Sequence, residues 1–369
     1  MKKTLQPVLF EAATNEKSRL MKNKLVGYLL LLLTLVTASA CSSMNPLTLL
    51  NKAASDCTRS NVLFDKQHEL RADFYYPEDT NCNDKGKFEQ LKLPTVVFIH
   101  GGSWRSGSKE LYGLIGAKLA AEQFLTIIPE YRLYPKTSYP GFIQDLETFT
   151  AWLHDNSEKL GVDLDNVHIV AHSAGAFNVA SFLLQEQYKK PFMFQQFIGL
   201  AGPYDFFLPT ENDKYSVVFS GDTANTVDSL PVVIAKRSSL SKQSIDTAVK
   251  RVVLLHGADD EVVAPENLIT FPQSLQRFKI PVLSFLYKDT GHVDVIAGVS
   301  GLPFVKSFIA DDLLALLSGA ELSETEQQAV MVESKARIAQ SELSRYLDRK
   351  RALQKSAMND EVLLSSDLK

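Results

Sequence analysis

The chain has 369 residues, of which 45% are hydrophobic and 22% charged, values that are typical of a globular protein able to bury a full core. Its formal net charge of −4 gives no electrostatic argument for nucleic-acid binding. The sequence contains no Cys-x-x-Cys pair, no His-Glu-x-x-His and no glycine-rich phosphate loop, so we expect no metal and no nucleotide cofactor.

The N-terminal region has the pattern of a secretory signal. Residues 25–40 form an uncharged, leucine-rich run preceded by two lysines. This run is short for a membrane-spanning helix and typical of the core of a signal peptide. We therefore expect residues 1–40 to be a signal peptide. Met21 is an alternative start, because the charged segment before it would make the signal unusually long.

Cys41 directly follows the small residues Ala38-Ser39-Ala40, as in a bacterial lipobox, where the cysteine receives the lipid. Ala38 departs from that pattern, which usually has leucine there. We expect a lipoprotein on the periplasmic or outer face of the cell envelope, with residues 41–62 as a tether. The alternative is an uncleaved anchor in the inner membrane that carries a periplasmic domain.

The chain has three cysteines. If Cys41 carries a lipid, Cys57 and Cys82 remain as a pair, and an oxidising compartment allows a disulfide between them. Two unpaired thiols are the alternative.

From residue 63 to residue 319 the chain has the pattern of one catalytic domain. Residues 70–76 alternate and end before a proline, as an early antiparallel strand does. Short apolar runs predict further strands at 95–100, 124–128, 167–171, 197–201, 252–255 and 282–286, and helical spacing marks 109–123, 142–160 and 174–187. Apolar strands that alternate with helices predict an α/β fold, with a mostly parallel sheet covered on both faces.

Two segments of the chain give weaker signals. Residues 203–245 carry turn formers and few apolar runs, so they could form a lid over a site or simply pack as loops. Residues 320–369 begin with a capping-box pattern and have only a thin apolar stripe, which indicates a solvated helical extension.

Two motifs carry the chemistry. One predicted strand ends in Ala171-His172-Ser173-Ala174-Gly175, followed by a helix, which is the pattern of a nucleophile elbow, a strained turn that presents a serine hydroxyl. Another ends in His100-Gly101-Gly102-Ser103-Trp104, the matching pattern for an oxyanion hole. Together they predict acyl transfer by Ser173. The N–H groups of Gly102 and Ala174, with Gly101 helping, would bind the oxyanion. Trp104 is a candidate for the wall of the substrate pocket, with simple packing as the alternative.

A nucleophilic serine needs a histidine base and an acid that orients the base, in the chain order Ser, acid, His for an elbow of this kind. Only His256 and His292 follow Ser173. His256 precedes the candidate acids, whereas His292 lies in a glycine-bearing loop after the last predicted strand, so we expect His292 to be the base. We expect His100 to brace its loop and His172 to point away from the site.

Three neighbouring carboxylates, Asp259, Asp260 and Glu261, follow the strand at 252–255. The segment 256–263 resembles the His-Gly-x-x-Asp-x-x-Val pattern found at this place in many α/β-hydrolases. That register selects Asp260 as the acid. Asp205 is an alternative acid, and we expect it to fix its own loop instead.

From about residue 70 to residue 315 the chain resembles α/β-hydrolases of the esterase/lipase group, which includes hormone-sensitive-lipase-like carboxylesterases and kynurenine formamidase-like enzymes. The residues that carry the resemblance are His100-Gly101-Gly102-Ser103-Trp104, Tyr131-Arg132-Leu133-Tyr134-Pro135, Pro140 with Asp145, Ala171-His172-Ser173-Ala174-Gly175, Asp260 and Gly291-His292. The resemblance implies an eight-stranded, mostly parallel sheet and hydrolysis of carboxylic esters without a cofactor. Ala171 replaces the first glycine of Gly-x-Ser-x-Gly, and Tyr134-Pro135 stands where lipase-like members often have Ala-Pro-Glu.

The expected function is therefore a serine carboxylesterase that hydrolyses small or medium acyl esters through Ser173, Asp260 and His292. An amide hydrolase of the arylformamidase type and a methylesterase are alternatives, and nothing in the pocket-forming residues separates them. A non-catalytic binding lipoprotein of the same fold is an alternative of another class. The intact serine, acid, histidine and His-Gly-Gly argue against it, because a binding module does not need all four.

Overall fold

The computed structural model describes residues 57–78, 80, 88, 91–206, 216–219, 228–237, 248–278, 280–300 and 308–319. The predicted signal peptide (1–40), Cys41, most of the tether (41–62), Cys82, most of the segment 203–245 and the C-terminal extension (320–369) lie outside these residues. Within the described ranges, none of the helices combines the length and the apolar character that crossing a bilayer requires.

An eight-stranded sheet lies at the centre of the fold, in the order β1-β2-β4-β3-β5-β6-β7-β8. Its strands are β1 (Thr58–Asp65), β2 (Leu70–Tyr75), β3 (Leu93–Ile99), β4 (Leu125–Pro129), β5 (Val162–His172), β6 (Gln196–Leu200), β7 (Val252–Gly257) and β8 (Val282–Tyr287). β2 pairs antiparallel with both β1 and β4, and the other neighbours are parallel. This confirms the predicted α/β-hydrolase sheet.

β1 differs from the prediction. It begins at Thr58, inside the segment expected to be a tether, so the sheet starts before residue 63. Only Phe64 and Asp65 of this strand are buried, because β1 is an outer strand with a partner on one side. A solvated outer strand lacks the apolar pattern that marks the inner ones. Cys57, directly before β1, is disulfide-bonded, while its predicted partner lies outside the described residues and the pairing stays a prediction.

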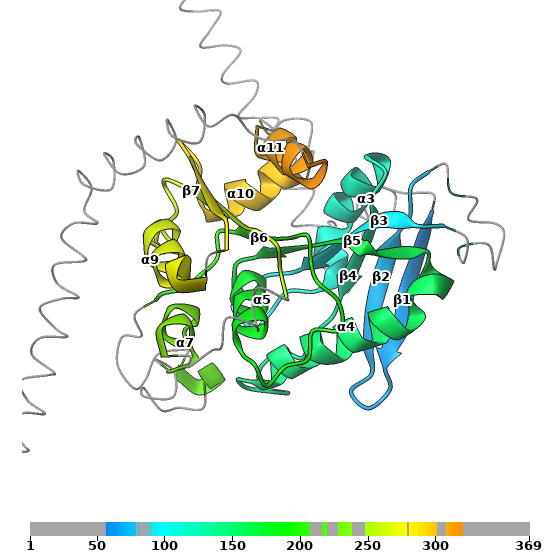
Figure 1. Ribbon diagram of the computed structural model, residues 1–369, viewed down its shortest axis with the longest axis horizontal. Helices are drawn as coiled ribbons and strands as arrows, with labels where there is room; N and C mark the ends of the chain where they lie inside the picture. The colour runs from blue at the N-terminus through cyan, green and yellow to red at the C-terminus, as the bar shows by residue number, and fades with distance from the viewer. Residues whose placement is uncertain are drawn as a thin grey trace, which may run out of the picture. The chain divides into compact units, whose positions relative to one another are not determined.

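Side chains of each inner strand alternate between two cores on opposite faces of the sheet. In β3, Val97 and Ile99 belong to one core, and Val96 and Phe98 to the other. The first face is covered by α4 (Gly141–Leu160), α5 (Ala174–Leu184), α7 (Pro231–Arg237) and α9 (Asn267–Leu275), and the second by α3 (Gly113–Ala121), α10 (His292–Val299) and α11 (Phe308–Leu317) (Figure 1). Burial on both faces explains why the inner strands have uniformly apolar sequences.

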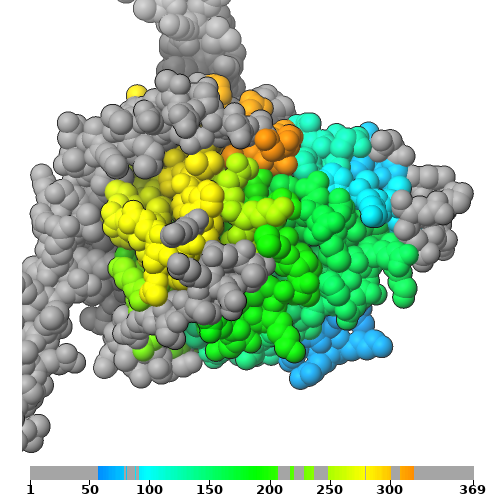
Figure 2. All heavy atoms as spheres, viewed as in Figure 1, coloured from blue at the N-terminus to red at the C-terminus, as the bar shows by residue number. Residues whose placement is uncertain are grey.

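The order of the sheet places the candidate site. In Figure 2 the surface runs from the blue β1–β2 hairpin at one end, through green residues from the middle of the chain, to the yellow residues that follow β7 at the other. The parallel strands β3, β5, β6, β7 and β8 end at one common edge of the sheet. The loops that follow their carboxyl ends gather there, and such an edge is where α/β proteins place their sites.

Candidate active site

Ser173 lies in the turn between β5 and α5. Its backbone has φ 50° and ψ −123°, a left-handed conformation that costs free energy for a residue with a side chain. A hydrogen bond from the Ser173 N–H to the carbonyl of Leu200 in β6 (2.9 Å) holds the turn. Gly175 permits the close packing, because a Cβ there would lie 2.4 Å from the carbonyl oxygen of Ile99. The result is a strained strand-to-helix turn that presents a serine.

Ser173, His292 and Asp260 form a line of hydrogen bonds. His292 Nε2 lies 3.0 Å from Ser173 Oγ, and His292 Nδ1 lies 2.7 Å from Asp260 Oδ2. An ionised carboxylate accepts hydrogen bonds but cannot donate them, so His292 Nδ1 carries the hydrogen. His292 Nε2 is then free to accept the proton of the Ser173 hydroxyl. His292 is the first residue of α10, and the N–H of the preceding Gly291 donates to Asp294 (2.8 Å). This capping bond fixes the start of the helix that carries His292.

Asp260 is buried, and its side chain is inaccessible to solvent. Oδ1 accepts hydrogen bonds from the N–H groups of Val262 (2.9 Å) and Val263 (2.8 Å). Burial by itself raises the pKa of Asp260, but hydrogen bonds from His256, His292 and the Val263 N–H outweigh it and hold that pKa well below its ordinary value. Asp260 is therefore ionised at neutral pH and able to orient His292.

The rival carboxylates lie elsewhere. Asp259 is exposed, and its backbone N–H donates to the Thr290 carbonyl (3.0 Å). Asp205 lies in the loop after β6, where its N–H donates to Asn267 Oδ1 (2.7 Å). His292 Nδ1 is already bound by Asp260 and needs neither of them.

The loop after β3 comes close to the serine turn and is strained. Gly102 has φ +130°, and a Cβ there would lie 2.0 Å from the Ser106 carbonyl oxygen, so only glycine fits. Ser103 and Trp104 also have positive φ, 53° and 58°. Ala174 is the first residue of α5, so its N–H has no acceptor within the helix. The N–H groups of Gly102 and Ala174 remain the candidate donors for an oxyanion.

Gly101 has a different role from the one expected. Its N–H donates to the Tyr112 hydroxyl (3.1 Å), which takes up the donor that was expected to help bind an oxyanion. Its missing side chain matters instead, because a Cβ would lie 2.9 Å from His172 Nδ1 and 3.0 Å from Ser173 Cβ. Gly101 thus allows the loop after β3 to approach the serine turn.

His172 lies beside the candidate base, and the prediction that it points away from the site is wrong. Its ring centroid is 5.1 Å from that of His292, and its Nδ1 accepts a hydrogen bond from the Tyr112 hydroxyl (3.1 Å). Burial, with the neighbouring His292, lowers the pKa of His172 to about 3, so the ring is neutral. The prediction considered only the direction of the strand, whereas His292 comes from a distant segment that packs against the end of β5.

His256 makes a contact with the candidate acid that the sequence analysis did not predict. It lies in β7 and is 1% exposed. Its Nε2 is 3.1 Å from Asp260 Oδ2 and 2.9 Å from the Val263 carbonyl oxygen. Chain order argued against His256 as the base but left open a role beside the acid. The signal was the four-residue spacing between His256 and Asp260, which places the two side chains together across a short turn.

Trp104 belongs to a packed aromatic cluster. This agrees with simple packing, the alternative to a place in the wall of a substrate pocket. Its side chain is 3% exposed, and its Nε1–H donates to Asn178 Oδ1 (2.8 Å). Its ring packs against the rings of Phe142, Phe177, Phe206 and Phe219. The cluster holds the loop after β3 against α4 and α5.

His100 braces the same loop from within. The ring is buried, stacks on Tyr131 at a centroid distance of 4.4 Å, and its Nδ1 lies 2.9 Å from the Gly101 carbonyl oxygen. Burial lowers the pKa of His100 to about 4, so the ring is neutral and can donate to that carbonyl.

A buried lysine anchors the segment that follows this loop. Lys109 is 1% exposed, with Nζ 3.1 Å from Glu130, 3.9 Å from Asp73 and paired with Glu110. Burial alone lowers the pKa of Lys109, but the three carboxylates outweigh this effect and raise it, so the lysine stays charged. Because Asp73 lies in β2 and Glu130 follows β4, the lysine ties the segment to the sheet.

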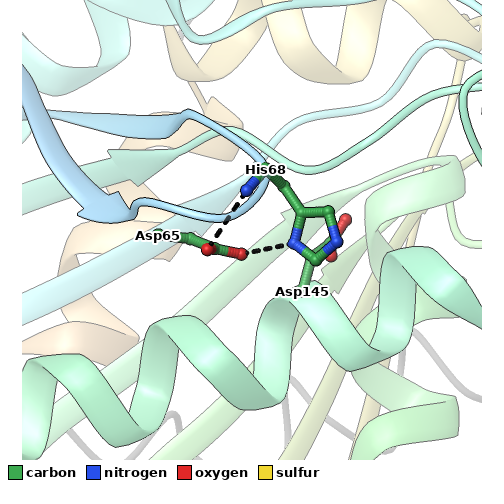
Figure 3. A group of neighbouring side chains, drawn as sticks. All are labelled: Asp65, His68 and Asp145. Atoms are coloured by element: carbon green, nitrogen blue, oxygen red, sulfur yellow. Dashed lines mark hydrogen bonds and ion pairs between the residues drawn. The ribbon is translucent and has the colours of Figure 1, made fainter.

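One group of side chains among the described residues has the composition of a metal site. Ligand atoms of Asp65, His68 and Asp145 lie within 4.8 Å of one another, with His68 on the β1–β2 hairpin facing α4 (Figure 3). His68 Nδ1 already binds Asp65 Oδ2 (2.7 Å), and the Arg132 guanidinium lies 2.6 Å from Asp145 Oδ1. A guanidinium repels a cation and occupies the lone pairs that a metal needs. The ligand atoms are therefore already engaged in two separate pairs, one within the hairpin and one between Asp145 and Arg132, and the group does not fit a metal centre.

The BD-FAE family matches residues 84–275, which are 192 of the 369 residues and include the loop after β3, the serine turn and Asp260.

Similar proteins with curated descriptions include esterases. The probable isoprenylcysteine alpha-carbonyl methylesterase ICMEL2 of Arabidopsis thaliana is 25% identical over 259 residues, which cover 65% of this chain and 58% of that protein. Esterase LipC of Mycobacterium tuberculosis is 25% identical over 196 residues, which cover 50% of this chain and 48% of that protein. The chain thus spans about half the length of these relatives.

Solved structures with the same fold include inhibited esterase B of Lactobacillus rhamnosis. Its TM-score is 0.56 at 17% identity, covering 76% of this chain and 94% of that one. Esterase Est2 of Thermogutta terrifontis with bound propionate has a TM-score of 0.55 at 14% identity, covering 72% of this chain and 93% of that one. At these identities the likeness concerns the fold.

Proposed function

We propose that this chain, which belongs to the BD-FAE family, is a serine carboxylesterase that hydrolyses small or medium acyl esters. The observation that carries the proposal is the line of hydrogen bonds from Ser173 through His292 to Asp260. The names of the curated relatives, which include methylesterases and an esterase, support an ester as the bond that is cleaved.

In the proposed reaction Ser173 Oγ attacks the carbonyl carbon of the ester. His292 Nε2, 3.0 Å away, takes the hydroxyl proton and delivers it to the departing alcohol. Asp260 keeps the hydrogen of His292 on Nδ1 and stabilises the imidazolium that forms. Water then attacks the acyl-serine with the help of the same histidine, and the free acid leaves.

The N–H groups of Gly102 and Ala174 would bind the negative oxygen of the tetrahedral intermediate. Loss of one such donor costs about 2.7–4 kcal/mol of transition-state stabilisation. The positive φ angles of Gly102, Ser103 and Trp104 support this role, because a strained loop that is held by packing keeps its donors in place before the reaction starts.

Two exposed apolar side chains support an apolar group on the substrate. Val293 directly follows His292 and is 68% exposed, and Val262, whose N–H binds Asp260, is 65% exposed. Both residues lie within two positions of Asp260 or His292 in the chain, so we expect the site to favour uncharged acyl or alcohol portions over charged ones.

The test uses Ser173→Ala and His292→Ala with p-nitrophenyl acetate as the substrate. Each variant should lose at least about 10³-fold in kcat, because the serine and its base act as one unit. Circular dichroism should show a folded protein in both cases. Near-normal turnover by either purified variant would contradict the assignment.

A methylesterase is the second candidate, and the names of the first relatives favour it. An amide hydrolase of the arylformamidase type shares the same machinery. A panel of p-nitrophenyl esters, an S-farnesylcysteine methyl ester and a formanilide separates the three. The proposed function predicts the highest kcat/KM for the p-nitrophenyl esters of short and medium acids.

We also propose that Cys41 is lipidated and anchors the enzyme at the periplasmic or outer face of the envelope. The support is the sequence, in which an apolar run and three small residues precede the cysteine. The wild-type protein should incorporate radiolabelled palmitate and fractionate with membranes, and Cys41→Ser should lose the label. An intact mass that still includes residues 1–40 would favour the uncleaved anchor instead.

A further inference from the structure

The candidate acid is bound by two histidines. Asp260 Oδ2 lies 2.7 Å from His292 Nδ1 and 3.1 Å from His256 Nε2, while Oδ1 accepts two backbone N–H groups. A carboxylate has about four lone-pair positions, and four donors face this one, although the single Nε2–H of His256 is shared with the Val263 carbonyl oxygen. The mechanism described above uses His292 and leaves His256 without a part.

His256 is a hydrogen-bond donor at Nε2. Both of its neighbours there, Asp260 Oδ2 and the Val263 carbonyl oxygen at 2.9 Å, are acceptors, so Nε2 carries the hydrogen. The ring is 1% exposed and belongs to β7, where His256 pairs with Leu286 of β8. The sheet therefore fixes the position of this donor, whereas His292 comes from the helix that follows the last strand.

We propose that His256 is a positioning residue of the reaction, whose Nε2–H holds Asp260 Oδ2 in the orientation that faces His292. The assignment rests on the proposed function, because it gives His256 a part in the same site. The bond has a second consequence. A donor on Oδ2 draws negative charge away from His292 and so limits how strongly Asp260 stabilises the imidazolium.

The titratable groups around Asp260 come from three elements, namely His256 from β7, His292 from α10 and His172 at the end of β5. His172 is neutral, because burial lowers its pKa to about 3. Asp294 of α10 is bound to the Gly291 N–H, and Asp259 is exposed to solvent. Among these groups, His256 and His292 contact Asp260 Oδ2, so removal of the His256 donor changes the negative charge that this oxygen presents to His292.

The test measures kcat and KM of the full-length protein with p-nitrophenyl butyrate as a function of pH. His256→Leu removes the donor, and His256→Gln places an amide N–H near the position of Nε2. His168→Leu is the matched control. His168 is also a buried histidine of the sheet, 3% exposed, and it lies in β5. Its ring forms hydrogen bonds with Asn166 and Gln196 and not with residues of the site.

We expect His256→Leu to lower kcat about 10- to 100-fold, the range that a hydrogen bond to a charged group covers, with KM within about threefold of wild type. The acidic limb of its kcat/KM profile should move to higher pH, because His292 then faces a more negative oxygen. His256→Gln should restore most of kcat, and His168→Leu should keep the wild-type limb. The proposal is overturned if His256→Leu has the kcat and the acidic limb of the wild-type protein. It is also overturned if His256→Leu loses kcat and His256→Gln does not restore it.

Two further variants keep the result decisive. If His256→Leu does not fold, His256→Asn takes its place, because the shorter amide does not reach Asp260 Oδ2. Ser173→Ala separates the two proposals. If Ser173→Ala retains turnover, the proposed function fails and the assignment of His256 falls with it. If Ser173→Ala is inactive and the His256 variants behave as wild type, only the assignment of His256 fails.

Discussion

Two buried aspartates, Asp145 and Asp260, place the same side chain in opposite settings. Their side chains are 2% and 0% exposed, and both accept hydrogen bonds at both oxygens. Asp145 is bound by one residue, Arg132, through its backbone N–H (2.8 Å), its Nε (2.8 Å) and its terminal NH2 group (2.6 Å). Asp260 is bound by two histidines and two backbone N–H groups.

The partner decides what each carboxylate can do. An arginine keeps its charge at all physiological pH values, so the Arg132 pair can hold the loop after β4 to α4 but cannot take up or release a proton. A histidine gains and loses a proton near neutral pH, so Asp260 can stabilise a charge that exists only during a reaction. Loss of Asp260 should therefore affect activity most, and loss of Asp145 should affect stability most.

The largest effect is expected for Asp260→Asn. The variant should lose about 10⁴-fold in kcat, the loss known for this change in Ser-His-Asp enzymes, because an amide no longer selects the tautomer of His292 that can accept the serine proton. Steady-state kinetics with p-nitrophenyl acetate gives the value. A loss of less than tenfold would remove Asp260 from the mechanism.

Asp145→Asn should lower the free energy of unfolding by about 3–5 kcal/mol, because Arg132 is left with an uncompensated charge at a mostly buried site. Urea unfolding followed by circular dichroism measures this change. The kcat of the folded variant should stay within about threefold of wild type. If Asp145→Asn loses activity and keeps the unfolding midpoint of the wild-type protein, Asp145 takes part in the reaction and does not differ from Asp260 in its role.

Stability should fall with acid in a window set by the buried histidines. Burial lowers the pKa of His100 and His168 from 6.5 to about 4 and that of His172 to about 3, so the unfolded chain binds protons that the folded chain does not. The contribution of these neutral rings to stability is fully present above about pH 6.5. It declines from there to about pH 4, by about 3 kcal/mol for each of His100 and His168, and the decline from His172 continues to about pH 3. Asp260, whose pKa is depressed, loses its contribution only below the ordinary aspartate pKa of about 3.9.

Thermal unfolding between about pH 4 and pH 8 tests this window. His168→Gln, whose amide does not titrate, should lose less stability over the window than wild type. A decline of equal size in both proteins would show that His168 does not contribute to it.

The smallest effect is expected for Asp259→Asn, the neighbour of Asp260. Its side chain is exposed, so kcat should stay within about twofold of wild type, as is usual for exposed positions away from special features. A large loss in Asp259→Asn together with a small one in Asp260→Asn would mean that the wrong carboxylate was assigned to His292.

The inner strands and the serine turn could be predicted from the sequence because their signals are local. An apolar run followed by small residues is enough to predict β5 and the turn at Ser173. β1 was not predicted, because an outer strand needs no apolar pattern. The contact of His256 with Asp260 is also local, and its four-residue spacing is visible in the sequence. The approach of His172 to His292, in contrast, depends on where the loop after β8 folds, and the Tyr112 bond to Gly101 joins residues eleven positions apart. Such contacts are tertiary, and no short pattern encodes them.

The central claim is that Ser173 is a nucleophile activated by His292 and Asp260. Incubation with a fluorophosphonate, followed by intact-mass analysis and peptide mapping, tests it directly without knowledge of the substrate. The account predicts a single adduct on Ser173, no adduct in Ser173→Ala, much slower labelling in Asp260→Asn and wild-type labelling in folded Asp145→Asn. A folded wild-type protein that does not react, or an adduct that persists in Ser173→Ala, would contradict the account.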